Sequence, residues 1–89
     1  MENKYYEKRK AKILLDLIEQ YTKANDKIDV NKKLNQLADE LYYKNRSSLS
    51  QKMIDVTLAI HSFTQAAMSG GHFQDLTEFI PGLKEIINS

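Results

Sequence analysis

The 89-residue chain contains no cysteine, and several other common features are scarce. Without cysteine there is no disulfide framework and no thiolate zinc site, which fits a cytosolic compartment. Only one proline and three glycines occur, and they form no glycine-rich phosphate-binding loop. Basic and acidic side chains nearly balance, at a net charge of +1. The molecule as a whole is therefore not expected to bind polyanions.

A long hydrophobic run is also missing. The longest candidate is the uncharged stretch 56–74, which has about the length of a minimal membrane span. It includes two histidines, two glutamines and a double glycine, so it is not apolar throughout. The N-terminus is charged and has no apolar segment typical of a signal peptide. We expect one soluble, cytoplasmic domain covering residues 1–89.

The uncharged stretch predicts the central helix of the fold. Its apolar residues recur at steps of three and four, which is the spacing of a helix face. Two such stripes run side by side: Leu49, Met53, Val56, Ile60, Phe63 and Ala67, then Ile54, Leu58, His61, Gln65 and Met68. A helix apolar over so much of its girth should contact more than one neighbour. We therefore expect this helix to be the most buried one, with Gly70 and Gly71 at its end.

Two amphipathic helices precede it. The first is expected from about Lys4 to Ala24, with Tyr6, Ile13, Leu14, Leu17, Ile18 and Tyr21 on its apolar face. The second should begin near Val30 with Asp26 or Asp29 as its cap and end near Lys44. Ser48 and Gln51 have the spacing of a capping box for the third helix.

The last segment carries a helical period that passes through Pro81 and Gly82. A proline inside a helix removes a backbone hydrogen bond and clashes with the preceding turn. Either the final helix is kinked at Pro81, or a short helix ends near Ile80 and another turn follows, and the unbroken period favours the kink. Because short loops join the four segments, neighbouring helices should alternate in direction. The predicted fold is an all-α antiparallel four-helix bundle.

Catalytic and metal-binding patterns are not evident. His61 and His72 lie eleven residues apart without the i, i+3 or i+4 partner that helical metal sites use. We interpret His61 as bordering the core and His72 as lying in a loop. No carboxylate pair, nucleophile elbow or triad stands out. We predict a non-enzyme with no cofactor, no metal and no catalytic residues.

The charge is uneven along the chain. Residues 1–46 carry eleven basic and eight acidic side chains, whereas residues 47–89 carry two basic and four acidic ones. The run Lys8-Arg9-Lys10, with Lys4, Lys12 and two nearby tyrosines, leaves open a regulatory or adaptor protein that binds nucleic acid. The simpler interpretation is a solvated first turn of a long helix, and no nucleic-acid partner is expected.

Binding through surface shape remains, and the second half of the chain offers the surface. A glycine turn, exposed aromatic residues and an interrupted last helix could leave an apolar edge for a partner protein or a peripheral membrane contact. The alternative is that Phe73 and Phe79 fill the core. A homodimer through an exposed face of the last helix is a further possibility, so we expect a monomer or a weak homodimer. The candidate partner-binding residues are Met68, Gly70, Gly71, His72, Phe73, Pro81 and Lys84.

Taken together, four segments resemble a known family. They are a lysine-rich first helix with ILLDLIEQY, the amphipathic KKLNQLADELYYK, the serine-led SSLSQKMIDVTLAI, and an ending in LKEI. In this order they resemble the enterocin A immunity family, the immunity proteins of Gram-positive bacteria against pediocin-like bacteriocins.

The resemblance implies a cytoplasmic antiparallel four-helix bundle that protects the producing cell from its own peptide toxin. It further implies non-catalytic binding on the cytoplasmic side of the toxin's membrane receptor, a mannose-type sugar permease. Discrimination among toxins would lie in the C-terminal half, which here is the third helix, the glycine turn and the last helix.

Overall fold

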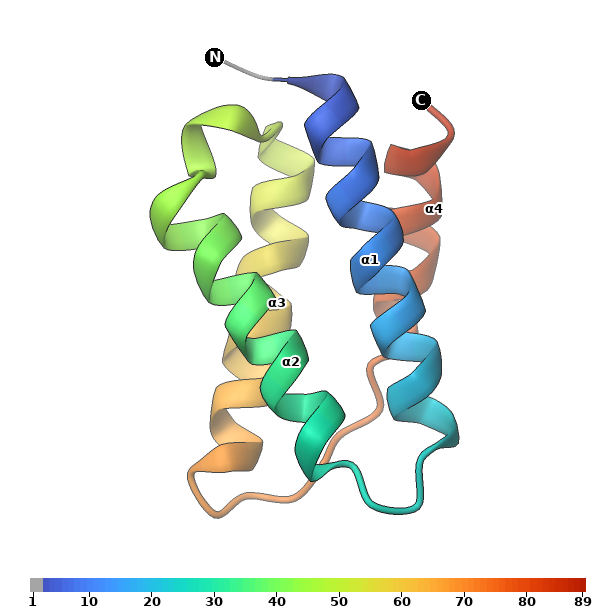
Figure 1. Ribbon diagram of the computed structural model, residues 1–89, viewed down its shortest axis with the longest axis vertical. Helices are drawn as coiled ribbons and strands as arrows, with labels where there is room; N and C mark the ends of the chain where they lie inside the picture. Colours follow the sequence, from blue (N-terminus) through green and yellow to red (C-terminus); the bar gives the residue numbers. More distant parts are fainter. Residues whose placement is uncertain (1–2) are drawn as a thin grey trace.

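The computed structural model describes residues 3–89. Its regular elements over that range are all helical, with no β-strand. Four α-helices make up the frame: α1 (Lys4–Lys23), α2 (Ile28–Asp39), α3 (Gln51–Met68) and α4 (Ile80–Ile87). Three short helical turns join them: a π-helical turn η1 (Glu40–Lys44) and the 3-10 turns η2 (Arg46–Ser48) and η3 (Thr77–Phe79). In Figure 1, α1 and α3 run downward and α2 and α4 run upward.

We name the two ends of the molecule after their places in Figure 1. The upper end comprises residues 3–10, at the start of α1, and the connection 40–50, and the C-terminal end of α4 lies at the same end. The lower end comprises residues 21–28, between α1 and α2, and residues 68–77, between α3 and α4. Of the helix pairs, α1 packs most extensively on α4 and α2 on α3.

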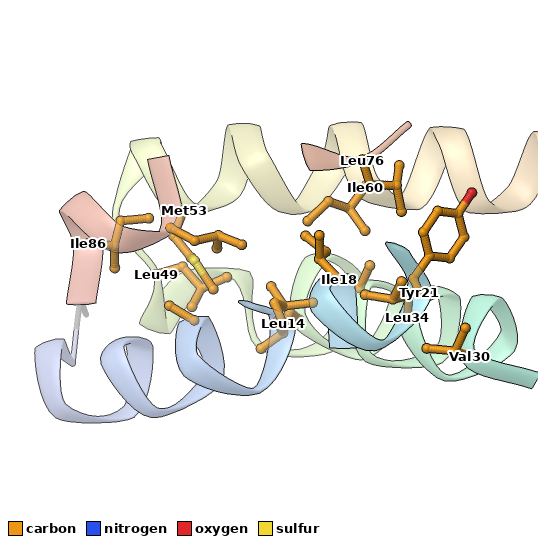
Figure 2. Close-up of a cluster of buried hydrophobic side chains, with 14 residues drawn as sticks. Leu14, Ile18, Tyr21, Val30, Leu34, Leu49, Met53, Ile60, Leu76 and Ile86 are labelled. Carbon is orange, nitrogen blue, oxygen red and sulfur yellow. The ribbon is translucent and has the colours of Figure 1, made fainter. Parts of the chain in front are cut away.

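The core lies between these two helix pairs and extends along the whole molecule. Leu14 and Ile18 of α1 face Leu34 of α2 and Ile60 of α3 in its middle (Figure 2). Burying such aliphatic side chains contributes about 1.5–3 kcal/mol each. The sequence placed Ile13 on the buried face of α1, but this was wrong. Ile13 is exposed, and the small Ala11 lies in the core instead.

The prediction that α3 is the most buried helix was also wrong. Its second stripe is largely at the surface, since Leu58, Gln65 and Met68 are exposed. The buried face of α3 consists of Met53, Ile60 and Ala67 of the first predicted stripe, together with Thr57 and Thr64. The expectation that α3 contacts more than one neighbour is confirmed, because it packs against both α2 and α4.

Polar contacts in the α2–α3 interface explain this orientation. Asn31 donates to the Thr64 carbonyl over 3.0 Å, and Asn35 donates to the Thr64 hydroxyl over 3.1 Å. The Thr64 hydroxyl in turn donates to the Ile60 carbonyl over 2.8 Å. These bonds satisfy the buried Thr64 hydroxyl and hold the Thr64 side of α3 against α2.

The start of α3 differs from the predicted capping box. Ser50, not Ser48, is the N-cap residue, and its hydroxyl accepts the Met53 N–H. Ser48 lies in η2, and Leu49 continues in extended, buried backbone. In a capping box an acidic or amide side chain within the helix accepts the N–H of the cap residue. Here Glu7 of α1 takes this role, because its carboxylate accepts the Ser50 N–H over 2.6 Å.

The end of α3 is as predicted. Gly70 has a φ of +94°, and the Gly71 N–H donates to the Ala66 carbonyl over 3.1 Å. These are features of a Schellman C-cap, which needs a left-handed residue that glycine supplies without steric cost. The expected ends of α1 near Ala24 and of the second helical segment at Lys44 are confirmed as well.

The kink at Pro81 was wrong. The last helix is short, but it begins at Ile80 and does not end there. Residues 71–76 have no regular structure, and α4 begins at Ile80 with Pro81 in its first turn. Proline is tolerated there because the N–H groups of the first turn have no partner within the helix. The helical spacing from Phe73 onward therefore does not correspond to a continuous helix.

Candidate functional site

The lower end contains a cavity of about 260 Å³. The last turn of α1 forms one wall and the irregular connection between α3 and α4 forms the other. Its lining residues are Tyr21, Thr22, Lys27, Phe73, Gln74, Asp75 and Thr77. Segments about 50 residues apart in the sequence thus meet at one site.

Tyr21 holds the two walls together. Its hydroxyl donates to the Gln74 carbonyl over 2.7 Å, and its ring meets Phe73 edge-on at 6.3 Å between centroids. The Tyr21 side chain is buried, and burial, followed by the charge of Asp75, raises the pKa of its hydroxyl above the ordinary value. The phenol is therefore neutral and available as a donor at physiological pH.

Lys27 lines the cavity next to the C-terminal end of α1. Its ammonium donates to the carbonyls of Tyr21 and Ala24 over 2.8 and 2.6 Å and lies 5.2 Å from the centroid of the Tyr21 ring. Carbonyls at a helix C-terminus lack partners within the helix and attract cations. Lys27 therefore acts as a cap that fixes the turn into α2.

Asp75 and Thr77 shape the opposite rim. One carboxylate oxygen of Asp75 accepts the Thr77 hydroxyl over 2.7 Å and the Thr77 N–H over 2.8 Å. These hydrogen bonds, that of the hydroxyl first, hold the pKa of Asp75 below its ordinary value. A fixed negative charge therefore stands at the rim, opposite the Lys27 side of the cavity.

The predicted partner-binding residues fall into two groups. Five of the seven follow one another at the lower end, and all five are exposed: Met68, Gly70, Gly71, His72 and Phe73. Of these, only Phe73 lines the cavity, with 39% of its surface exposed. Pro81 and Lys84 are exposed on α4 and do not line it.

Sequence reasoning missed the other half of the cavity. Tyr21 was placed on the apolar face of the first helix, and Lys27 and Asp75 were not among the candidate residues. The one local signal was Asp75-x-Thr77, a spacing that allows an aspartate to accept the N–H two residues on. Nothing local indicated that Tyr21 would reach Gln74.

The two histidines lie as interpreted from the sequence. His61 borders the core, with its Nε2 3.4 Å from the Asp39 carboxylate and its ring 5.6 Å from that of Tyr43. His72 is exposed in the irregular connection. Over residues 3–89 no three histidine or carboxylate side chains gather closely enough to hold a metal ion.

None of the helices in the described part of the chain combines the length and apolar character that a bilayer crossing requires.

No family model, curated protein or solved structure matches the chain. The likeness to the immunity proteins therefore rests on the pattern of helices and motifs in the sequence.

Proposed function

We propose that this chain is a bacteriocin immunity protein that protects its cell from a pediocin-like peptide toxin. It would act without catalysis, by binding on the cytoplasmic side of the toxin's receptor, a mannose-type sugar permease. The observation that carries the proposal is the series of helices, of 20, 12, 18 and 8 residues, with a glycine turn before the short last one. We assign this series to an antiparallel four-helix bundle.

The lower end is the surface that we assign to the partner. Met68 and Phe73 are exposed there at 48% and 39%, although both are large apolar residues. They flank the glycine turn, and Phe73 also lines the cavity. Exposed apolar side chains beside a cavity offer area for burial against a partner, which is the main source of affinity in protein interfaces.

Expression in a toxin-sensitive strain tests the proposal. Cells producing the chain should tolerate higher concentrations of at least one peptide in a broad panel of pediocin-like bacteriocins than cells with an empty vector. Tolerance should be specific, because immunity requires recognition of one toxin–receptor complex. Equal sensitivity to every peptide in the panel, with the protein present at a normal level, would contradict the proposal.

A matched pair of variants locates the binding surface. Phe73→Ser removes an aromatic side chain at the lower end, and Leu58→Ser removes an apolar side chain that is equally exposed, at 39%, in the middle of α3. We expect Phe73→Ser to abolish tolerance and Leu58→Ser to retain it, with both proteins folded by circular dichroism. Equal tolerance in the two variants would exclude the lower end as the contact.

A further inference from the structure

The upper end brings together two segments that lie about 40 residues apart in the sequence (Figure 1). The Asn3 N–H donates to the Ser48 carbonyl over 3.0 Å, and Glu7 accepts the Ser50 N–H. Lys10 and Glu40 approach each other to 3.8 Å between the two segments. The first turns of α1 and the connection from α2 to α3 therefore form one continuous surface.

This surface is strongly basic. Residues 3–10 and 40–50 carry six basic and two acidic side chains, a balance of +4 in a chain whose net charge is +1. The two acidic groups are both engaged, because Glu7 is buried and Glu40 faces Lys10. Within residues 3–89, five basic side chains have no carboxylate partner within ion-pair distance: Lys4, Lys8, Arg9, Lys44 and Arg46.

Tyrosines are interleaved with these basic residues. Tyr5 and Tyr43 are exposed at 75% and 63%, the highest values among the large apolar residues of the described chain. The Arg9 guanidinium lies 5.5 Å from the centroid of the Tyr5 ring, and that of Arg46 lies 4.7 Å from the Tyr42 ring. The upper end thus presents rings with an apolar body and a polar tip, surrounded by positive charge.

We propose that the upper end docks onto an anionic membrane surface. Basic side chains gain free energy near acidic lipid headgroups without any fixed geometry, and tyrosines are enriched at the interface between headgroups and acyl chains. The inference goes beyond immunity, because this binding requires neither toxin nor receptor.

Two features favour a membrane over single-stranded nucleic acid. Successive bases stack on open aromatic faces along a groove. Tyr42 and Tyr43 instead meet edge-on, at 83° between ring planes, and Arg46 lies over the Tyr42 ring. The second feature is the position of the cavity, which lies beside Tyr21 at the opposite end of the molecule and not along the basic surface.

Flotation of the purified protein with vesicles tests the inference. The probes are vesicles of phosphatidylcholine alone and vesicles in which part of it is replaced by anionic phosphatidylglycerol. We expect binding to the anionic vesicles only. It should weaken as salt is raised from about 0.01 M to about 0.15 M, because the Debye length falls from about 30 to about 8 Å.

Two double variants with the same change in net charge locate the binding surface. Lys44→Glu/Arg46→Glu reverses exposed charges at the upper end, and Lys32→Glu/Lys33→Glu reverses exposed charges on α2. Each basic residue near an anionic surface contributes about a fivefold gain in affinity. The first variant should therefore bind at least about 25-fold more weakly, and the second should stay within about fivefold of the parent. Circular dichroism establishes that both variants are folded.

Three outcomes would overturn the inference. They are equal losses in the two double variants, equal binding to neutral and anionic vesicles, and no binding to either. A single-stranded oligonucleotide that binds more tightly than anionic vesicles, with the same dependence on Lys44 and Arg46, would assign the surface to nucleic acid instead. Because no toxin is present, failure here leaves the immunity assay unaffected, and failure of that assay leaves vesicle binding unaffected.

Discussion

The upper and lower ends close the same core in opposite ways. At the upper end the buried Glu7 carboxylate accepts the backbone N–H of Ser50 and so joins α1 to the start of α3. At the lower end the Tyr21 phenol donates to the Gln74 carbonyl beside a cavity. The upper end is basic on its outside, and the lower end carries the exposed Met68 and Phe73 beside its cavity. The comparison indicates that one all-helical fold can present two separate surfaces, which differ in chemistry.

Removing the Glu7 carboxylate should lower the stability of the fold more than the three lower-end substitutions that follow, at Gly70, Tyr21 and Asp75. Glu7→Ala leaves the Ser50 N–H without its partner next to the helix start. Since bonds to charged acceptors contribute more than neutral ones, we expect a loss of about 2–3 kcal/mol in the free energy of unfolding. Urea denaturation measures it.

Two further variants test whether that loss comes from the hydrogen bond between the Ser50 N–H and Glu7. Glu7→Gln keeps an acceptor and should lose less than Glu7→Ala. Glu19→Ala removes an exposed carboxylate from the same helix and should stay within about 0.5 kcal/mol of the parent. If Glu7→Ala and Glu19→Ala are equally stable, the contact between Glu7 and Ser50 does not hold the upper end.

A substitution at Gly70 tests whether the lower end depends on the left-handed backbone conformation of this residue. Its φ of +94° is a conformation that residues with a side chain rarely adopt. Gly70→Ala should therefore cost about 1–2 kcal/mol. Gly82, which lies within α4, provides the control. The methyl group added by Gly82→Ala would lie 3.5 Å from Val56 Cγ2, which is an ordinary van der Waals contact. This substitution should be neutral or stabilise by up to about 1 kcal/mol. The same loss at both positions in urea denaturation would contradict the assigned cap.

Tyr21→Phe should cost about 1 kcal/mol in the same measurement, because it removes one buried hydrogen bond and keeps the ring. It should also change how the free energy of unfolding depends on pH in the alkaline range. The pKa of Tyr21 is raised by folding, so its contribution is complete below about pH 10 and is lost as pH rises through the raised value. The variant should lose less stability above pH 10 than the parent. Identical alkaline profiles would mean that Tyr21 titrates alike in both states.

The smallest effect is expected at Asp75. Hydrogen bonds from Thr77 lower its pKa in the folded chain. The stabilisation is therefore present above the ordinary value of about 3.9 and is lost as pH falls through the lowered one. Asp75→Asn should make stability slightly less dependent on pH below about 4. A parent and variant with the same acid profile would show that the rim is not held by this carboxylate.

Local sequence patterns predicted the elements better than their contacts. The glycine pair gave the end of α3 because a left-handed cap depends on local backbone alone. The cap at its start was misplaced because Ser48, with Gln51 three residues on, has the better local pattern, whereas the acceptor for the Ser50 N–H comes from Glu7 of another helix. The prediction at Pro81 was wrong because helical spacing does not tell the first turn of a helix from its interior.

The candidate site was predictable only in part for a similar reason. The sequence left Phe73 either exposed beside the glycine turn or in the core, and its exposed fraction of 39% agrees with the first alternative. Tyr21 has the spacing of a core residue, and its buried ring agrees with that interpretation. The position of its hydroxyl depends on where residues 72–76 pass, and the helical spacing from Phe73 onward wrongly predicted a helix there. Contacts between irregular segments distant in sequence leave no periodic signal.

Fluorescence of single labels tests the difference between the two ends most directly. Because the chain has no cysteine, Ser47→Cys at the upper end and His72→Cys at the lower end each give one site for an environment-sensitive dye, and both positions are exposed. On addition of anionic vesicles, docking through the upper end predicts a blue shift of the dye at position 47 and none at position 72. A shift at position 72, equal shifts at both positions, or no shift at position 47 would contradict it.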